Sequence, residues 1–457
     1  MLSADKTGLL KAFLGSLPGH VAARLAIAVE ADRLMDGHAL PHHDILNGLR
    51  PVLRNGDELQ RTLTPLRLFC RPFQDLLTSA PRLAKQKGRI ARGTLVPAWN
   101  WISQTLIPTE TAIYVRETRA LVLAQKDGEA IARAGQFWPV AAAAMAPALQ
   151  DANQRKLLEK TLGDAMAVED ADEMARLLAV GETIEQLALM LPKPVAAFNE
   201  QLLWDVRGIY DALAQSQPDA APYVSVITMN RLAKPWEALR LPIMVSRKHD
   251  ETLISKTDMG LVGEILFDRM DTLKASIQAT RHPLFDAEVL MDEVRTFADL
   301  SSHIVMEIEL KRDGEWGKRL LAERVSIGKV MEGFMDRAPK EFNAALPMSK
   351  GKGADFGRHP GAEKHEMAKR YARLVAGSRN FAAAASFAAK QKAIYDDLCT
   401  TLKRYNEDAV KALKTDPMNE VINAQFELCA ELSAILFSDE EAAMLRRRGK
   451  AAQAAAA

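Results

Sequence analysis

Apolar residues recur at helical spacing along most of the 457-residue chain. The repeats at 21–29, 174–191 and 262–277 each follow the period of an amphipathic helix. The repeat at 174–191 has one gap, at Gly181. These repeats predict helices with one buried face. The apolar positions between 421 and 436 wrap most of the way around a helix, which predicts a helix packed on several sides.

Evidence for strands is thin. The segment from Ile304 to Leu310 alternates in hydropathy, and Asp313-Gly314 suits a hairpin turn. The same residues also fit the end of a helix that breaks at Gly314 and Gly317, and we prefer this interpretation. The sequence therefore predicts an all-α fold, with bundle-like lobes of packed antiparallel helices and at most one minor β-hairpin.

Clusters of Pro and Gly divide the helical segments. They predict an N-terminal helical domain (1–192), a middle helical domain (193–345), a basic linker rich in Gly and Pro (346–361) and an Ala-rich helical region (362–457). We expect the end of the last region, from Arg446 onward, to fray.

The charge balance adds a local asymmetry. The chain has 60 Lys and Arg against 59 Asp and Glu, which excludes a uniformly basic nucleic-acid coat, but residues 1–109 hold 14 basic and 8 acidic side chains. The three cysteines form no CxxC pair, which fits a reducing compartment. With no secretory signal pattern and no apolar run of about 18 residues, we expect a cytoplasmic protein without a membrane span.

The strongest candidate site is a basic segment followed by two tryptophans, in a stretch without Asp or Glu between residues 75 and 110. Cations pair with phosphates and aromatic rings stack on bases, so this composition suits nucleic acid or another anionic surface. The alternative, which we favour, is a solvated segment whose tryptophans belong to the core. The candidate anion-binding residues are Arg82, Lys85, Lys87, Arg89, Arg92, Trp99 and Trp101.

An acidic stretch is the counterpart of that segment. Residues 164–185 hold seven acids and one base, Arg176. Acidic and basic patches can dock across domains or subunits. A solvated helix face explains the same pattern, and it is the interpretation that we favour here.

Three further carboxylates, Glu264, Asp268 and Asp271, share one face of a predicted helix. Such a set suits a divalent cation or acid/base chemistry. Because Arg269 and Lys274 lie nearby, we favour a solvated, neutralised face.

A histidine cluster gives no metal motif. His38, His42 and His43 lie close to Asp36 and Asp44, but Pro41 interrupts the helical spacing that a ligand pair needs. No GxSxG occurs, and no histidine follows an acid by three residues, as in di-metal bundles. We expect a polar turn at this position, and neither a metal nor a cofactor.

No segment resembles a known family closely enough to name. Extensive helical surface with mixed charge patches favours an interaction, scaffold or regulatory protein without catalysis of its own, bound to a protein partner that the sequence does not identify. The sequence is also compatible with a homo-oligomer. One alternative is a nucleic-acid or anionic-surface binder that uses residues 82–101, and a second is an enzyme whose site is assembled from distant helices.

Overall fold

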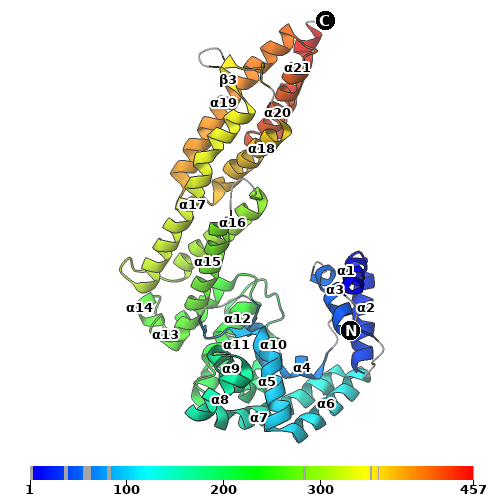
Figure 1. The fold of residues 1–457 in the computed structure, drawn as a ribbon. Coiled ribbons are helices and arrows are strands. Elements are labelled where there is room, and N and C mark those ends of the chain that lie inside the picture. Colours follow the sequence, from blue (N-terminus) through cyan, green and yellow to red (C-terminus); the bar gives the residue numbers. More distant parts are fainter. Residues whose placement is uncertain are drawn as a thin grey trace. The chain divides into compact units, whose positions relative to one another are not determined.

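The computed structural model describes residues 4–34, 40–54, 63–79, 84–280, 285–349, 353–358 and 360–455 (Figure 1). They form two compact units, Met1–Ala233 and Lys234–Ala457. Both units are built of helices, and the described residues add only two pairs of two-residue strands. The predicted all-α, multi-helix fold is confirmed.

The helices of the first unit are short to medium in length. Its α-helices are α1 (Ala4–Gly15), α2 (Gly19–Leu34), α3 (His42–Arg54), α4 (Pro65–Phe69), α5 (Leu95–Trp101), α6 (Pro108–Leu123), α7 (Asp127–Gln150), α8 (Ala152–Leu162), α9 (Ala165–Ala179), α10 (Gly181–Met190), α11 (Glu200–Ser216) and α12 (Pro222–Arg231). Between them lie the 3₁₀ turns η1 (Arg71–Leu76) and η2 (Arg92–Thr94), the π-helical turn η3 (Ile102–Leu106), and a parallel pair of strands, β1 (Leu77–Thr78) and β2 (Ile90–Ala91).

The second unit contains the longest helices. Its α-helices are α13 (Arg240–Ser246), α14 (Glu251–Ile254), α15 (Leu261–Ala279), α16 (Ala287–Glu307), α17 (Glu315–Ala345), α18 (Ala362–Gly377), α19 (Ala388–Thr415), α20 (Glu420–Leu436) and α21 (Asp439–Ala454). The 3₁₀ turns η4 (Pro235–Leu239), η5 (Asp258–Gly260) and η6 (Ser378–Asn380) and the antiparallel strands β3 (Met348–Ser349) and β4 (Gly353–Ala354) complete it.

The domain boundary predicted at 192/193 lies inside the first unit, and the boundary predicted at 345/346 lies inside the second. The boundary between the units falls at Ala233–Lys234, directly before η4. Pro235 opens η4, as the fixed φ of proline favours. Trp236 stacks on His303 at a ring distance of 4.2 Å, so it holds this turn against α16.

Helix α7 forms the centre of the core of the first unit, where it packs against α6, α8 and α9. Its buried alanines let neighbouring helices approach closely, and Trp138 fills the space between them. Gly181 marks the expected gap in the apolar stripe, because α9 ends and α10 begins there. A Cβ at Gly181 would lie 2.6 Å from the Trp138 ring, so the break is also a close packing point.

In the second unit α20 packs against α18, α19 and α21 (Figure 1). Its buried residues include Ile422, Leu428 and Ala430, which point to different sides of the helix. The prediction of a helix packed on several sides is therefore confirmed.

The segment with weak strand character is mostly helical. Helix α16 continues through Glu307, and only the next few residues are extended, with Glu309 bridging to Asp250. Gly314 is the N-cap of α17, but the predicted break at Gly317 is wrong, because this residue lies inside the helix. The preference for helix is confirmed for residues 304–307. The hairpin of this unit, β3–β4, lies instead within the predicted linker.

The described part of the predicted linker 346–361 contacts the helices around it. The Asp408 carboxylate on α19 accepts a hydrogen bond from the Ala354 N–H at 3.1 Å, and the Phe356 ring packs edge-on against Tyr405. Gln425 donates to the Arg358 carbonyl at 2.8 Å. Lys350 and Lys352 lie outside the described residues.

The expectation that the chain frays from Arg446 onward is wrong. Helix α21 continues to Ala454, since Leu445, Gly449 and Ala452 are buried along one of its faces. A Cβ at Gly449 would lie 2.3 Å from the Phe426 ring, so glycine allows this close contact. The composition of the tail suggested weak order, but its buried stripe of small residues stabilises the helix.

Candidate functional site

The described part of the basic segment, residues 84–92, packs against α9, the helix that carries most of the acidic stretch. The Lys85 ammonium lies 3.1 Å from a carboxylate oxygen of Asp170 and 2.7 Å from one of Glu173. None of these side chains is more than 10% exposed. Buried charges of this kind are tolerated when they are paired. Lys85 thus belongs to the interior of the first unit.

The backbone of the same segment binds the same two carboxylates. The Gly88 N–H donates to Glu173 at 2.9 Å. The Ala91 N–H and the Thr94 hydroxyl both donate to Asp170, at 3.1 and 2.8 Å. Two acids on α9 therefore satisfy one ammonium, two backbone amides and one hydroxyl, which fixes the path of the segment.

Glu173 has one more partner, the hydroxyl of Tyr223 on α12. Burial raises the pKa of Glu173, whereas the Lys85 ammonium and the Gly88 N–H act in the opposite direction. Burial also raises the pKa of Tyr223, so its hydroxyl keeps its proton at neutral pH and can donate to the carboxylate.

A second ion pair joins the acidic stretch to Arg71, which precedes the basic segment in the chain. Arg71 on η1 binds both carboxylate oxygens of Glu185 on α10. The interpretation of the acidic stretch as a solvated face is wrong for Asp170, Glu173 and Glu185, which are buried. It is correct for Glu169, which is exposed. The acidic and basic segments dock inside the first unit.

The other described cations of the basic segment, Lys87, Arg89 and Arg92, lie closer to solvent. Lys87 is exposed, and its ammonium lies 6.0 Å from the centre of the Tyr223 ring. Arg89 donates to the side-chain oxygen of Gln86 at 3.1 Å, and Arg92 is exposed. Arg82 lies outside the described residues. Among the described cations of the segment, Lys87 and Arg92 thus offer the most accessible charge.

The two tryptophans belong to the aromatic core of the first unit. Trp101 is buried. Trp99 is half-buried and packs against Phe69 at a ring distance of 5.0 Å and against Tyr114 at 6.3 Å. Neither ring is described as lying beside Lys87 or Arg92, the accessible cations of the segment. The Trp99 ring instead borders an open groove.

This groove on the described surface of the first unit has a volume of about 630 Å³. It runs along α6, beside Trp99 of α5 and Ser103 of the π-helical turn η3. Single π-helical turns often occur at functional sites. We call it the α6 groove, and its lining residues are Trp99, Ser103, Pro108, Thr111, Ala112, Val115, Arg116, Arg119, Ala120 and Leu123.

The α6 groove combines an apolar floor with positive charge. Pro108, Ala112, Val115 and Leu123 follow one face of α6 at helical spacing. Two arginines and no acid line the groove. The surface is therefore suited to a ligand that is partly apolar and carries negative charge.

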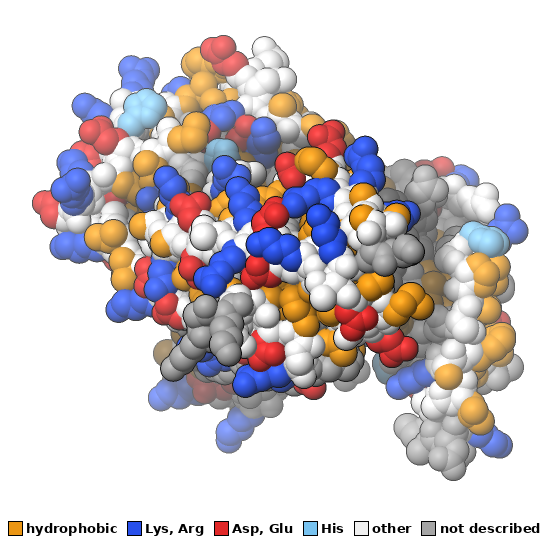
Figure 2. Space-filling view, turned by 90° about the horizontal axis from the view of Figure 1, so that it is seen from above, with side chains coloured by type: hydrophobic (Ala, Val, Ile, Leu, Met, Phe, Trp, Pro, Cys, Tyr) orange, Lys and Arg blue, Asp and Glu red, His pale blue; other side chains and the backbone are white. Residues whose placement is uncertain are grey.

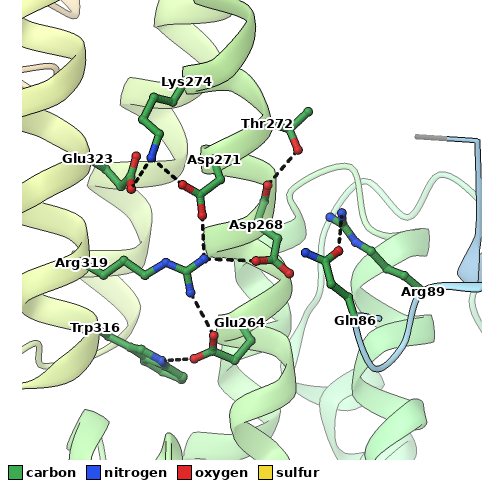
Figure 3. A network of polar contacts seen from close by, with 10 residues as sticks. All are labelled: Gln86, Arg89, Glu264, Asp268, Asp271, Thr272, Lys274, Trp316, Arg319 and Glu323. Carbon is green, nitrogen blue, oxygen red and sulfur yellow. Dashed lines mark hydrogen bonds and ion pairs between the residues drawn. The ribbon is translucent and has the colours of Figure 1, made fainter. Parts of the chain in front are cut away.

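The three carboxylates on α15 receive a cation from another helix. The Arg319 guanidinium on α17 lies 2.9 Å from Glu264, 3.1 Å from Asp268 and 2.7 Å from Asp271, and Figure 3 shows it at the centre of this set. Arg319 holds the position that a bound cation would take. The sequence predicts that this helix face is neutralised. The cation that contacts all three carboxylates is Arg319, which lies far from them along the chain.

Lys274 extends the same network. Its ammonium lies 2.6 Å from Asp271 and 2.8 Å from Glu323 (Figure 3). Burial raises the pKa of Asp271, but the hydrogen bonds from Lys274 and Arg319 outweigh this effect and hold the pKa below its ordinary value. The network thus keeps Asp271 charged and joins α15 to α17.

The described histidines of the His38–His43 cluster have local partners. His42 lies 2.7 Å from Asp32, and His43 lies 2.8 Å from Asn47. Asp36 and His38 lie outside the described residues. Among the residues that the structure describes, no group of three His, Cys, Asp or Glu side chains is arranged to hold a metal ion.

Charge on the face drawn in Figure 2 is mixed. Blue Lys and Arg side chains stand beside red Asp and Glu side chains and orange apolar ones. Nucleic-acid surfaces need a run of cations that follows the phosphate backbone. On this face acidic side chains lie among the basic ones.

The α6 groove is the feature that sequence reasoning missed. Its signal is present, because the small and apolar positions of 108–123 recur every three or four residues. That pattern is the same for a helix that buries this face and for one that leaves it open. Only the packing of α7 on the opposite side of α6 shows which face stays accessible.

Comparison with protein-family models, curated proteins and solved structures gave no match to this chain. In the part of the chain that the structure describes, no helix combines the length and the apolar character needed to cross a bilayer.

Proposed function

We propose that this chain is a helical interaction protein, acting as a scaffold or regulator without catalysis of its own, and that it binds a partner protein in the α6 groove. One observation carries this proposal: a continuous apolar face of α6 is left open beside a partly exposed tryptophan and two arginines. Exposed apolar patches with a polar rim commonly mark sites of protein interaction.

The form of the groove favours a protein partner over a small molecule. Sites for small ligands enclose most of the ligand surface. The α6 groove instead lies open along a helix of 16 residues, which is about 24 Å long. Such a shape suits a partner segment that lies along the helix.

Binding of nucleic acid or another anionic surface through residues 82–101 is the alternative proposal. Its support is reduced by the enclosure of Lys85 and Trp101, which leaves Lys87 and Arg92 as accessible cations. The second alternative, an enzyme with a site assembled from distant helices, has no described arrangement of side chains in its favour.

The test compares two tryptophan substitutions on exposed alanines. Ala112→Trp fills the α6 groove, whereas Ala143→Trp adds the same side chain to an exposed position of α7 outside it. Tagged full-length chains are isolated from their own cells with and without nuclease, and proteins that bind the wild type are quantified. Partners are then purified and their dissociation constants measured.

We expect at least one partner to bind the wild type and Ala143→Trp equally, and Ala112→Trp about tenfold or more weakly. Circular dichroism spectra check that both variants are folded. If every partner binds Ala112→Trp as well as the wild type, the α6 groove is not the interaction site. If binding depends on nucleic acid, the basic segment becomes the better proposal.

A further inference from the structure

The chemistry of the α6 groove indicates what kind of partner segment it binds, and this inference rests on the proposed function. The first argument is charge. Arg116 is exposed and makes no ion pair with any residue in the described part of the chain. The nearest acid along the helix, Glu117, is already bound by Arg133 at 2.5 Å. A partner that supplies a carboxylate would therefore complement the groove.

The second argument is shape. Ala112 and Ala120 lie two turns apart on the lining face of α6, about 12 Å along the helix axis. Small residues at this spacing let a second helix approach closely, and Val115 and Leu123 offer larger apolar contacts beside them. The lining residues all come from helical elements and provide no strand edge for an extended peptide.

We propose that the α6 groove binds an amphipathic, acidic helix of a partner protein. The apolar stripe of that helix packs on Ala112 and Ala120, and a Glu or Asp beside the stripe pairs with Arg116. Arg119 adds positive charge at the same edge of the groove.

The test uses a displayed library of helical peptides against the immobilised full-length chain. The library has a fixed stripe of Ala and Leu at helical spacing, and the flanking positions vary among Glu, Gln and Lys. Selection is run on the wild type, on Arg116→Glu and on Lys156→Glu. Lys156 is exposed on α8, so its substitution makes the same change in net charge outside the groove.

We expect the wild type and Lys156→Glu to select peptides rich in Glu on one side of the stripe. The best of these peptides should bind Arg116→Glu about tenfold more weakly. Selection on Arg116→Glu should shift toward Lys.

The outcomes separate this inference from the proposed function. Peptides that are lost in Ala112→Trp but show no preference for acids would overturn the acidic helix and leave the groove as an interaction site. Peptides that bind Ala112→Trp and the wild type equally would overturn both. If sedimentation shows that the wild type self-associates and Ala112→Trp does not, the occupant is a second copy of the chain and the acidic partner is wrong.

Discussion

The ammonium of Lys85 lies 2.7 Å from the carboxylate of Glu173, which is 88 residues away along the chain. This contact ties the basic segment to the acidic face of α9. It changes the expected role of Lys85, because a cation inside the protein stabilises the fold and is not available to an external phosphate.

Lys85→Met should lower the free energy of unfolding by about 3–5 kcal/mol, because it leaves Asp170 and Glu173 buried without their shared cation. Urea denaturation followed by circular dichroism measures this change. Lys87→Met is the matched control, and its exposed side chain should cost less than about 0.5 kcal/mol. Equal effects for the two variants would show that Lys85 is not held as the ion pair indicates.

Gly181→Ala should destabilise the first unit by about 1–3 kcal/mol, since its Cβ would lie 2.6 Å from the Trp138 ring. Gly208→Ala is the control, because no atom lies within 4 Å of a Cβ at that position in α11. It should stabilise the protein by about 0.5–1 kcal/mol through the higher helix propensity of alanine. Thermal melts of both variants test the opposite signs, and two changes of the same sign would contradict this packing.

Asp250→Asn should give a loss of stability that depends on pH. Hydrogen bonds from Lys311 and from the Thr252 side chain and N–H lower the pKa of Asp250 to about 2. A carboxyl whose pKa is lower in the folded state adds stability above its unfolded pKa and loses it as the pH falls through the folded value. The variant should therefore melt below the wild type at pH 7, and the gap should close toward pH 2.

Melting temperatures of the wild type and Asp250→Asn between pH 7 and pH 2 test this expectation. Asp292→Asn, on the exposed surface of α16, controls for the change in net charge. A gap between the wild type and Asp250→Asn that stays constant over the whole range would show that the carboxylate of Asp250 does not contribute as described.

Arg319→Leu should uncover the three carboxylates on α15. Because Glu264 and Asp271 are each more than one third exposed, solvent screening keeps the expected loss of stability to about 1–2 kcal/mol. Without the guanidinium, Glu264, Asp268 and Asp271 offer oxygen ligands to Ca²⁺. Calcium should then raise the melting temperature of the variant and leave that of the wild type unchanged.

Magnesium and a monovalent salt at equal ionic strength control for general screening in the Arg319→Leu experiment. A calcium response of equal size in the wild type would mean that Arg319 does not occupy the cation position. No response in the variant would mean that the carboxylates separate once Arg319 is removed.

The helical elements follow largely from local sequence. The apolar period at 262–277 and the surrounded pattern at 421–436 correspond to α15 and α20, because a helix places every third or fourth residue on one side whatever it packs against. Local pattern was less reliable at the end of the chain. The basic and Ala-rich composition suggests fraying, but Gly449 of α21 packs against the Phe426 ring of α20, and Ala452 is buried.

The sequence by itself thus determined the fold class, the main helices and the candidate charged segments. The tertiary structure decided what each charge does. Lys85 pairs with Glu173, and Arg319 pairs with Asp268, which is 51 residues away. The spacing of residues along the chain predicts neither ion pair. The charge pattern of a segment gives only the number and sign of its charged groups. The electrostatic energy of each group depends on its burial and on partners that lie far away along the chain. For the same reason, only packing distinguishes the open face of α6 from a buried one.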